Sequence, residues 1–327
     1  MVELNVVFLI VKNYKVGYKN VDLLAKNFII FSLCILLILP VTVKGISPKE
    51  DLSVSEQETG KSNPCKCVVF RLDDVRDKYF DPVQIKIMNL FLSKEAPLTL
   101  GLVMQSIGKD TSILNKISEG YEKGLFELAL HGWEHKNYTE LSQQEQKHSL
   151  YKANERFRII FGNKSEVFIP PHNKFNNDTV TVIKELGIKI LSSSIPVQDK
   201  FDQGRSIFNS STKKQNANQS QGIYFLPHSP ELKKFVGQAQ IKVPMNEVVN
   251  DINDSIDKYG YAVVLMHPQS FIKLDKTGKY TDVVKENINR AEINYKDMND
   301  LEYLIDHIKQ KGIEISSFHK ILNDTIS

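Results

Sequence analysis

Short apolar runs alternate with longer amphipathic stretches along most of the chain. The apolar runs have strand length and are VVFRL from residue 68, LTLGLVM from 98, FELALH from 126, EVFIP from 166, IKILSS from 188, YAVVLMHP from 261 and GIEISSF from 312. Stretches typical of helices lie between them, at 82–93, 111–123, 142–161, 177–186 and 297–311. This alternation predicts a mostly parallel sheet covered by helices. The expected fold class is therefore α/β, a distorted (β/α) barrel of about seven parallel strands.

The region from 196 to 244 fits this repeat poorly. It contains the low-complexity segment STKKQNANQSQG at 211–222, which has no apolar period. We expect the region to be exposed and mobile.

The N-terminal part has a different pattern. Residues 28–43 are almost wholly apolar and follow four lysines, which indicates an export signal. The run is shorter than the roughly 20 residues that span a bilayer, so cleaved signal and retained anchor both stay open. The polar stretch after it is typical of a tether. We predict a signal peptide or membrane anchor at 1–45, a flexible linker at 46–66 and a folded domain at 67–327, with an extracytoplasmic location and membrane attachment through 28–43.

Charge and cysteine content narrow the classes of partner. The net charge of +3 is spread along the chain without a dense Lys/Arg block, so nucleic acid is not expected. Several N-x-[ST] sequons agree with an extracytoplasmic location.

Outside the apolar run the only cysteines are Cys65 and Cys67. Their spacing is tight for an internal bridge, so we expect a minor structural role, with an intermolecular disulfide or a metal role as the alternatives.

Titratable side chains follow several of the predicted strands. Asp73 and Asp74 end the first strand, His131 ends the third and His267 ends a late one. The carboxyl ends of barrel strands meet at one rim, where the active sites of such barrels lie. His131 and His135 are four positions apart and could converge on one centre from a helical turn.

These residues can be assigned chemical roles. Asp74, His131 and His135 offer one oxygen and two nitrogens, a set that leaves positions open for water and substrate, as catalytic zinc sites require. Asp73 would point to the other face of a continuous strand and could act as general base. His267 could then protonate a leaving amine. We expect one divalent cation, with Zn²⁺ as the first expectation, although ligand type alone does not decide the metal.

Four motifs together resemble the polysaccharide deacetylase family, the NodB-type carbohydrate esterases. FRLDDV at 70–75 is similar to the first motif, HGWEH at 131–135 to the second, FIPPHNKFN at 168–176 to the third, and LMH at 265–267 to the closing motif. The resemblance implies that Asp73 is the base and His267 the acid. It implies that Asp74, His131 and His135 hold the metal, and that Pro171 and His172 line the substrate groove, in a deacetylase-like catalytic domain at 67–327.

The chain departs from the family pattern in its third motif. Ile169 stands where the family usually has an arginine that pairs with the base, and His172 and Asn173 replace the usual Tyr-Gly. Arg71 lies two residues before Asp73 and so on the same strand face, where it could supply the missing positive partner. The family's fourth motif is not placed, and YFLPHSPEL at 224–232 is only a candidate. Trp133 either stacks on a sugar ring or packs in the interior.

The favoured function is metal-dependent removal of acetyl groups from N-acetylated sugars of a polysaccharide or surface glycan. Two alternatives stay open. One keeps the fold and the metal but acts on an O-acetyl ester or a non-sugar amide. The other is a non-catalytic glycan-binding protein at the cell surface, made plausible by Ile169 and His172.

Overall fold

The coordinates are a computed structural model that describes residues 65–194, 222–236 and 239–326. The predicted signal or anchor, nearly all of the predicted linker and the low-complexity segment up to residue 221 lie outside the described residues, so these expectations stay predictions. Within the described ranges, none of the helices combines the length and apolar character needed to cross a membrane.

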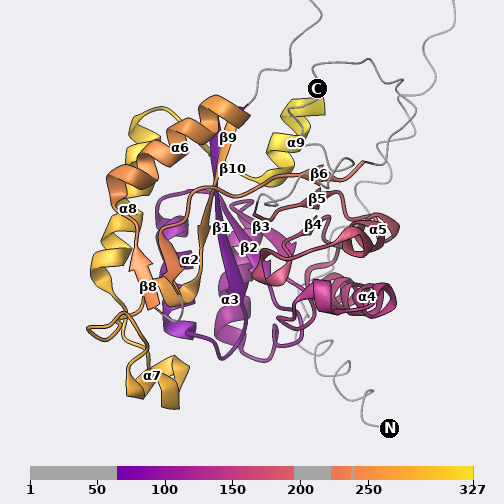
Figure 1. Ribbon diagram of the computed structural model, residues 1–327, viewed down its shortest axis with the longest axis horizontal. Helices are drawn as coiled ribbons and strands as arrows, with labels where there is room; N and C mark the ends of the chain where they lie inside the picture. Colours follow the sequence, from indigo (N-terminus) through magenta and orange to yellow (C-terminus); the bar gives the residue numbers. More distant parts are fainter. Residues whose placement is uncertain (1–64, 195–221, 237–238, 327) are drawn as a thin grey trace, which may run out of the picture. The chain divides into compact units, whose positions relative to one another are not determined.

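A curled parallel sheet forms the centre of the domain (Figure 1). Its strands run in the order β9, β1, β2, β3, β4, β5, β6, and β10 also pairs with β1. Their bounds are β1 Cys67–Val75, β2 Leu98–Leu102, β3 Phe126–Leu130, β4 Val167–Phe168, β5 Ile190–Leu191, β6 Tyr224–Phe225, β9 Tyr261–Met266 and β10 Glu314–Ser316. The predicted barrel of about seven parallel strands is confirmed, although several strands are shorter than expected.

Helices surround this sheet (Figure 1). The predicted ones are α2 Asp81–Ser93, α3 Thr111–Glu122, α4 Gln143–Phe161, α5 Asn177–Glu185 and α8 Tyr295–Gln310. The hydroxyl of Ser142 caps the first turn of α4, and Glu145 completes the capping box, which explains why that helix begins where the pattern predicts. Elements that were not predicted are α6 Met245–Tyr259, α7 Asp282–Glu286, α9 Phe318–Ile326 and the antiparallel pair of β7 Lys233–Val236 with β8 Ala239–Lys242.

Residues 224–231 close the barrel, which corrects the expectation of an exposed region for this stretch. β6 pairs with β5, and the segment after β6 reaches β9. There the backbone N–H of Ser229 donates to the carbonyl of Val263, and the N–H of Leu265 donates to the carbonyl of Pro230, each at 3.0 Å. A two-residue strand and isolated bridges produce no periodic pattern, so this closure could not be predicted from the order of apolar and polar residues.

Side chains alternate along β1 between two environments. Val68, Phe70 and Leu72 pack in the layer between sheet and helices. Val69 belongs to a second cluster that also takes in Phe318 from α9. Because side chains of a strand alternate between faces, Arg71 and Asp73 share the face of Val69. The barrel interior therefore changes along β1 from an apolar end near α9 to a charged end at the carboxyl rim.

Cys65 and Cys67 form a disulfide, so the expectation that their spacing is too tight for a bridge is wrong. The residue between them, Lys66, has a φ of 45°. This left-handed conformation turns the chain back and brings the two Cα atoms to 5.2 Å, a normal separation for a disulfide. The bridge ties the chain just before β1.

Candidate active site

Arg71 and Asp73 form a buried, two-pronged ion pair on β1. Nε of Arg71 donates to Oδ1 of Asp73 at 2.8 Å, and Nη2 donates to Oδ2 at 2.6 Å. Both residues are essentially inaccessible, at 0% and 1% exposure. Burial alone would raise the pKa of Asp73, but the positive charge of Arg71 keeps that pKa below its usual value. A lowered pKa favours the ionised form of Asp73.

Two further residues hold the guanidinium of Arg71. Its Nη1 donates to Oγ of Ser192 at 3.0 Å, and its Nη2 donates to Oδ1 of Asn173 at 2.7 Å. Ser192 follows β5, and Asn173 lies in the loop after β4, so these bonds cross the interior of the barrel. No sequence pattern pointed to Ser192. Asn173 was recognised from the sequence only as a departure from the family pattern, without a role.

A bulge in β1 sets the direction of Asp74. Leu72 pairs with Leu100, and Val75 pairs with Leu102. An advance of three residues along β1 therefore matches an advance of two residues along β2, which defines a bulge in β1. Asp74 has a φ of 63° within this bulge. The strand does not continue regularly through the two aspartates, which corrects the simple alternation predicted for them. The extra residue brings both carboxylates to the same rim.

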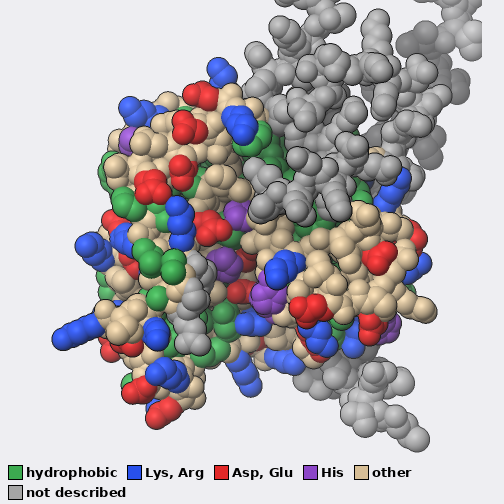
Figure 2. Space-filling view, viewed as in Figure 1, with side chains coloured by type: hydrophobic (Ala, Val, Ile, Leu, Met, Phe, Trp, Pro, Cys, Tyr) green, Lys and Arg blue, Asp and Glu red, His purple; other side chains and the backbone are tan. Residues whose placement is uncertain are grey.

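Asp74, His131 and His135 form a group with the composition of a metal site, because one ligand atom from each lies within 4.8 Å of the other two. Oδ1 of Asp74 is 3.5 Å from Nε2 of His131 and 2.9 Å from Nε2 of His135. Ligand atoms on a tetrahedral cation with bonds of about 2.1 Å lie about 3.4 Å apart. Figure 2 shows histidine and acidic side chains gathered near the middle of one face.

The buried atoms of this group fit a cation. Nδ1 of His131 donates to the carbonyl of Ile169 at 2.8 Å, so Nε2 is the ring nitrogen that faces Asp74. Nε2 of His131 and Oδ1 of Asp74 are buried and make no hydrogen bond within the described residues. Burial would raise the pKa of Asp74, yet the two imidazoles hold that pKa well below its usual value. A divalent cation requires an ionised carboxylate and would take the place of the proton on the ring nitrogen.

The turn between the two histidines is not helical, in contrast to the helical turn that their spacing suggested. His131 follows β3 directly, and the chain then bends through Gly132, whose φ is 82°. A Cβ on Gly132 would lie 2.8 Å from the carbonyl oxygen of Glu134. The glycine therefore allows a tight bend in the chain. This bend places the ring of His135 next to that of His131, with the ring centroids 5.1 Å apart.

His267 lies beside Asp73 at the same rim. β9 runs parallel to β1, and Leu72 is in register with Met266, so the next residues, Asp73 and His267, are neighbours at the ends of adjacent strands. Burial lowers the pKa of His267, while the charges of Asp73 and Asp74 oppose that shift. The predicted general base and general acid thus occupy adjacent positions.

The polysaccharide deacetylase family model matches residues 60–191. That segment belongs to the polysaccharide deacetylase family. The match confirms the resemblance carried by the first three motifs, which all lie inside the matched residues. His267 lies beyond them, so its role rests on its register with Asp73.

Solved structures of carbohydrate esterases are also similar to this chain. The esterase domain of a multidomain xylanase from the hindgut metagenome of Trinervitermes trinervoides is 14% identical over 79% of this chain and 89% of that one, with a TM-score of 0.46. A family 4 carbohydrate esterase from Streptomyces lividans is 12% identical over 77% and 92%, with a TM-score of 0.44. A family 4 pseudoenzyme from Bacillus anthracis is 14% identical over 80% and 67%, with a TM-score of 0.46. Curated protein sequences give no match.

Compared with the usual deacetylase third motif, the positive partner of the base here comes from a different strand. Ile169 is fully buried in the apolar cluster of the barrel interior, and its carbonyl orients His131. Arg71 provides the guanidinium from β1 instead. Asn173 has a φ of 54°, a conformation that asparagine tolerates better than most residues, which explains how it can replace the usual glycine.

The remaining residues that were predicted to line the substrate groove are Pro171, His172 and Trp133, and they have different surroundings. Pro171 is buried and opens the short 3₁₀ turn η3 Pro171–Asn173. The ring of His172 is exposed and packs edge-on against His135, with centroids 4.4 Å apart. Trp133 packs against the core, and Nζ of Lys152 lies 4.2 Å from its ring centroid. A sugar contact of Trp133 therefore stays a prediction.

Two site residues were missed or left undecided at the level of sequence. A Cβ on Gly101 would lie 3.2 Å from Oδ1 of Asp73, so this glycine of β2 leaves room for that carboxylate. His228, in the window considered for the fourth motif, is 9% exposed, and neither of its ring nitrogens has a hydrogen-bond partner among the residues that the structure describes. Burial lowers its pKa to about 3. No sequence pattern distinguishes Gly101 from other strand glycines.

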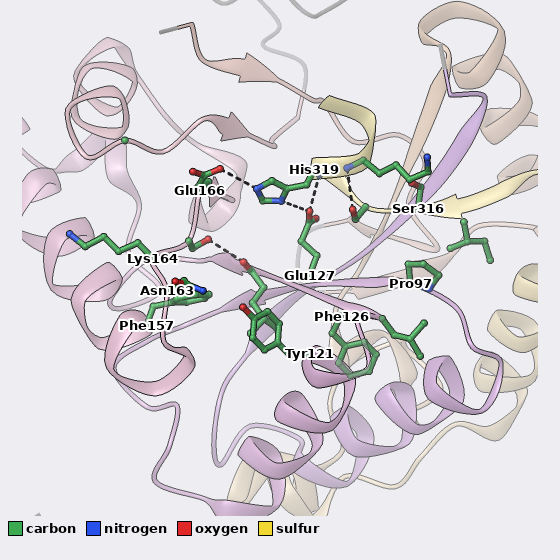
Figure 3. Close-up of a pocket in the computed structure, with 18 of the residues that line it drawn as sticks. Pro97, Tyr121, Phe126, Glu127, Phe157, Asn163, Lys164, Glu166, Ser316 and His319 are labelled. Carbon is green, nitrogen blue, oxygen red and sulfur yellow. Dashed lines mark hydrogen bonds and ion pairs between the residues drawn. The ribbon is translucent and has the colours of Figure 1, made fainter. Parts of the chain in front are cut away.

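A large cavity of about 880 Å³ lies away from this rim (Figure 3). It is lined by the first residues of β3 and by residues around β4, β10 and α9. The main charged groups that line it already have partners within the protein. Glu127 accepts hydrogen bonds from the backbone N–H groups of Phe318 and His319, and the ring of His319 also contacts Glu166. These contacts dock α9 on the barrel, so we assign the chemistry to the carboxyl rim despite the size of this cavity.

Proposed function

We propose that this chain is a metal-dependent hydrolase that removes acetyl groups from N-acetylated sugars of a polysaccharide or surface glycan. The observation that carries the proposal is the juxtaposition of the triad of Asp74, His131 and His135 with the arginine-paired carboxylate of Asp73. A metal-ligand set next to an ionised carboxylate that does not bind the metal is the arrangement that hydrolysis of an amide needs.

The residues of the chain would divide the work as follows. A divalent cation held by the triad would polarise the acetyl carbonyl and lower the pKa of a water molecule. Asp73 accepts the proton of the attacking water. His267 donates a proton to the nitrogen of the departing amino sugar, and a backbone N–H near His172 stabilises the developing oxyanion. The products are acetate and a free amino sugar.

The ion pair of Arg71 with Asp73 favours an active enzyme over a non-catalytic glycan-binding protein. A carboxylate buried without a positive partner would tend to be protonated and could not act as a base at neutral pH. Arg71 removes this difficulty, since its two hydrogen bonds favour the ionised form. Arg71 therefore offers Asp73 a positive partner in place of the family arginine that is missing at Ile169.

Acetate release tests the proposal directly. The full-length chain is incubated with N-acetylglucosamine oligomers with and without a chelator, and the same assay is run on Asp73→Asn. We expect release that the chelator and the substitution each abolish. A parallel panel of O-acetyl esters and simple acetamides identifies the acetyl linkage. Glycan binding without any acetate release would contradict the proposal and favour the non-catalytic alternative.

We also propose that the domain works outside the cytoplasm, attached or released through residues 28–43. The support is the apolar composition of that run and the lysines before it. Protease treatment of intact cells that express the chain should degrade the domain while a cytoplasmic marker survives. Full protection of the domain would contradict this location.

A further inference from the structure

A buried glutamine contacts the metal-type carboxylate from the side away from the histidines. Gln269 lies in the 3₁₀ turn η5 Pro268–Phe271, directly after His267, and is 7% exposed. Its Nε2 donates to Oδ2 of Asp74 over 3.4 Å. Oδ1 of the same carboxylate faces His131 and His135. The two oxygens of Asp74 therefore have separate partners.

A tyrosine fixes which end of the Gln269 amide faces Asp74. The hydroxyl of Tyr79 donates to Oε1 of Gln269 at 3.2 Å. An ionised carboxylate can only accept hydrogen bonds, so the NH₂ end must face Asp74, and the carbonyl end is left to accept from Tyr79. The reverse orientation would place two acceptors against each other at Asp74.

The loop that carries Tyr79 is itself held in place. The amide of Gln84 donates to the carbonyl of Arg76 at 2.8 Å and also to the carbonyl of Tyr79, and it accepts from the N–H of Arg76 at 3.1 Å. The guanidinium of Arg76 lies 3.8 Å from the centroid of the Tyr79 ring. The chain of contacts from Tyr79 through Gln269 to Asp74 thus begins in a fixed loop and ends at the proposed metal site.

We infer that Gln269 is a positioning residue for the metal, which holds Oδ2 of Asp74 so that only Oδ1 is presented to the cation, with Tyr79 orienting its amide. The inference rests on the proposed function and adds a residue that none of the motifs contains. Hydrogen bonds to the outer oxygen of a ligating carboxylate fix its direction, and their loss typically weakens metal binding by about 10- to 100-fold. Asp74 depends on this restraint because its backbone lies in a bulge.

The test measures Zn²⁺ affinity of the full-length chain by competition with a chromophoric chelator. Gln269→Met keeps the size of the side chain but removes both hydrogen bonds, and we expect Zn²⁺ binding to weaken by about 10- to 100-fold. Gln240→Met is the matched control, because Gln240 is an equally buried glutamine, at 8% exposure, that lies in β8. Its affinity for Zn²⁺ should equal that of the unaltered chain.

A second substitution separates positioning from a purely structural effect. Tyr79→Phe should weaken Zn²⁺ binding less than Gln269→Met does, and it should add nothing when combined with Gln269→Met, since Tyr79 acts through the amide. Thermal unfolding of the metal-free chain should change little. If Gln269→Met does not fold, Gln269→Asn replaces it, because the shorter amide cannot reach both partners.

The outcomes distinguish the two proposals. The first outcome is that the unaltered chain binds Zn²⁺ and that Gln269→Met, or Gln269→Asn where that variant is used, binds it with the same affinity. This result would overturn the role of Gln269 and leave the proposed function intact. A full additional loss from Tyr79→Phe in the double variant would also overturn it. Absence of Zn²⁺ binding to the unaltered chain would overturn the metal-dependent function and this inference together.

Discussion

The pairing of Arg71 with Asp73 gives the sharpest prediction. Arg71→Met keeps much of the apolar stem but removes four hydrogen bonds and the only positive charge that contacts Asp73 in the described structure. Both partners are buried, so the variant leaves an unpaired carboxylate in the interior. Removing one partner of a buried pair costs about 3–5 kcal/mol of the free energy of unfolding. A typical domain has about 5–15 kcal/mol in total, so the loss would be a substantial part of the free energy of unfolding.

The sign of the pH dependence follows from the pKa of Asp73. That pKa is lowered in the folded state, so the ionised group contributes stability above its unfolded pKa, and this contribution is lost as pH falls through the folded value. The stability difference between Arg71→Met and the unaltered chain should therefore be largest near neutral pH and shrink in acid. Removal of Arg71 also raises the pKa of Asp73, so the acid limb of the deacetylation rate should move to higher pH.

A double-mutant cycle makes the reasoning refutable. Urea unfolding is measured for Arg71→Met, Asp73→Asn and the combination of both. The combination should be more stable than Arg71→Met alone, because it leaves no buried charge without a partner. A double variant no more stable than Arg71→Met, together with a stability difference that does not depend on pH, would show that the ion pair is not what holds Asp73.

Three further predictions concern separate sites. Gly101→Ala should reduce acetate release at least tenfold with little change in melting temperature, because the new Cβ would lie 3.2 Å from Oδ1 of Asp73; unchanged release would mean that the base has room to move. Glu127 raises the pKa of His319, so their contact stabilises the fold below the unfolded pKa of His319 and loses that effect as pH rises through the folded value. His319→Gln should therefore lower the melting temperature at pH 5 and have little effect at pH 9, and an equal loss at both would contradict the ion pair. The sequon at Asn137 should stay unglycosylated, since the side chain already bonds Thr139 and Glu140 and lies two residues from His135; full occupancy in glycopeptide mass mapping would count against the site.

Sequence alone was sufficient for the repeating pattern and for the residues at the strand ends. Alternation of apolar and amphipathic segments depends on local periodicity, so β1, β3, β9 and the helices between them could be predicted. Asp73, Asp74, His131 and His267 could be singled out because titratable residues end several predicted strands, and His135 because it lies four positions after His131. In a parallel barrel, such strand ends necessarily meet at one rim.

The pairing of Arg71 with Asp73 could be predicted from their spacing on one strand, but only the tertiary structure decided the partners that come from distant parts of the chain. The closure of the barrel by residues 229–231 depends on two bridges to β9, and the bulge at Asp74 depends on its register with β2. Ser192, Asn173 and Gln269 reach the site from 100 or more residues away along the chain. Their contacts arise from strand register and loop direction, which short-range patterns of residues do not encode. Local chemistry therefore identified the candidate ligands and the base, whereas packing across the barrel determined how they are held.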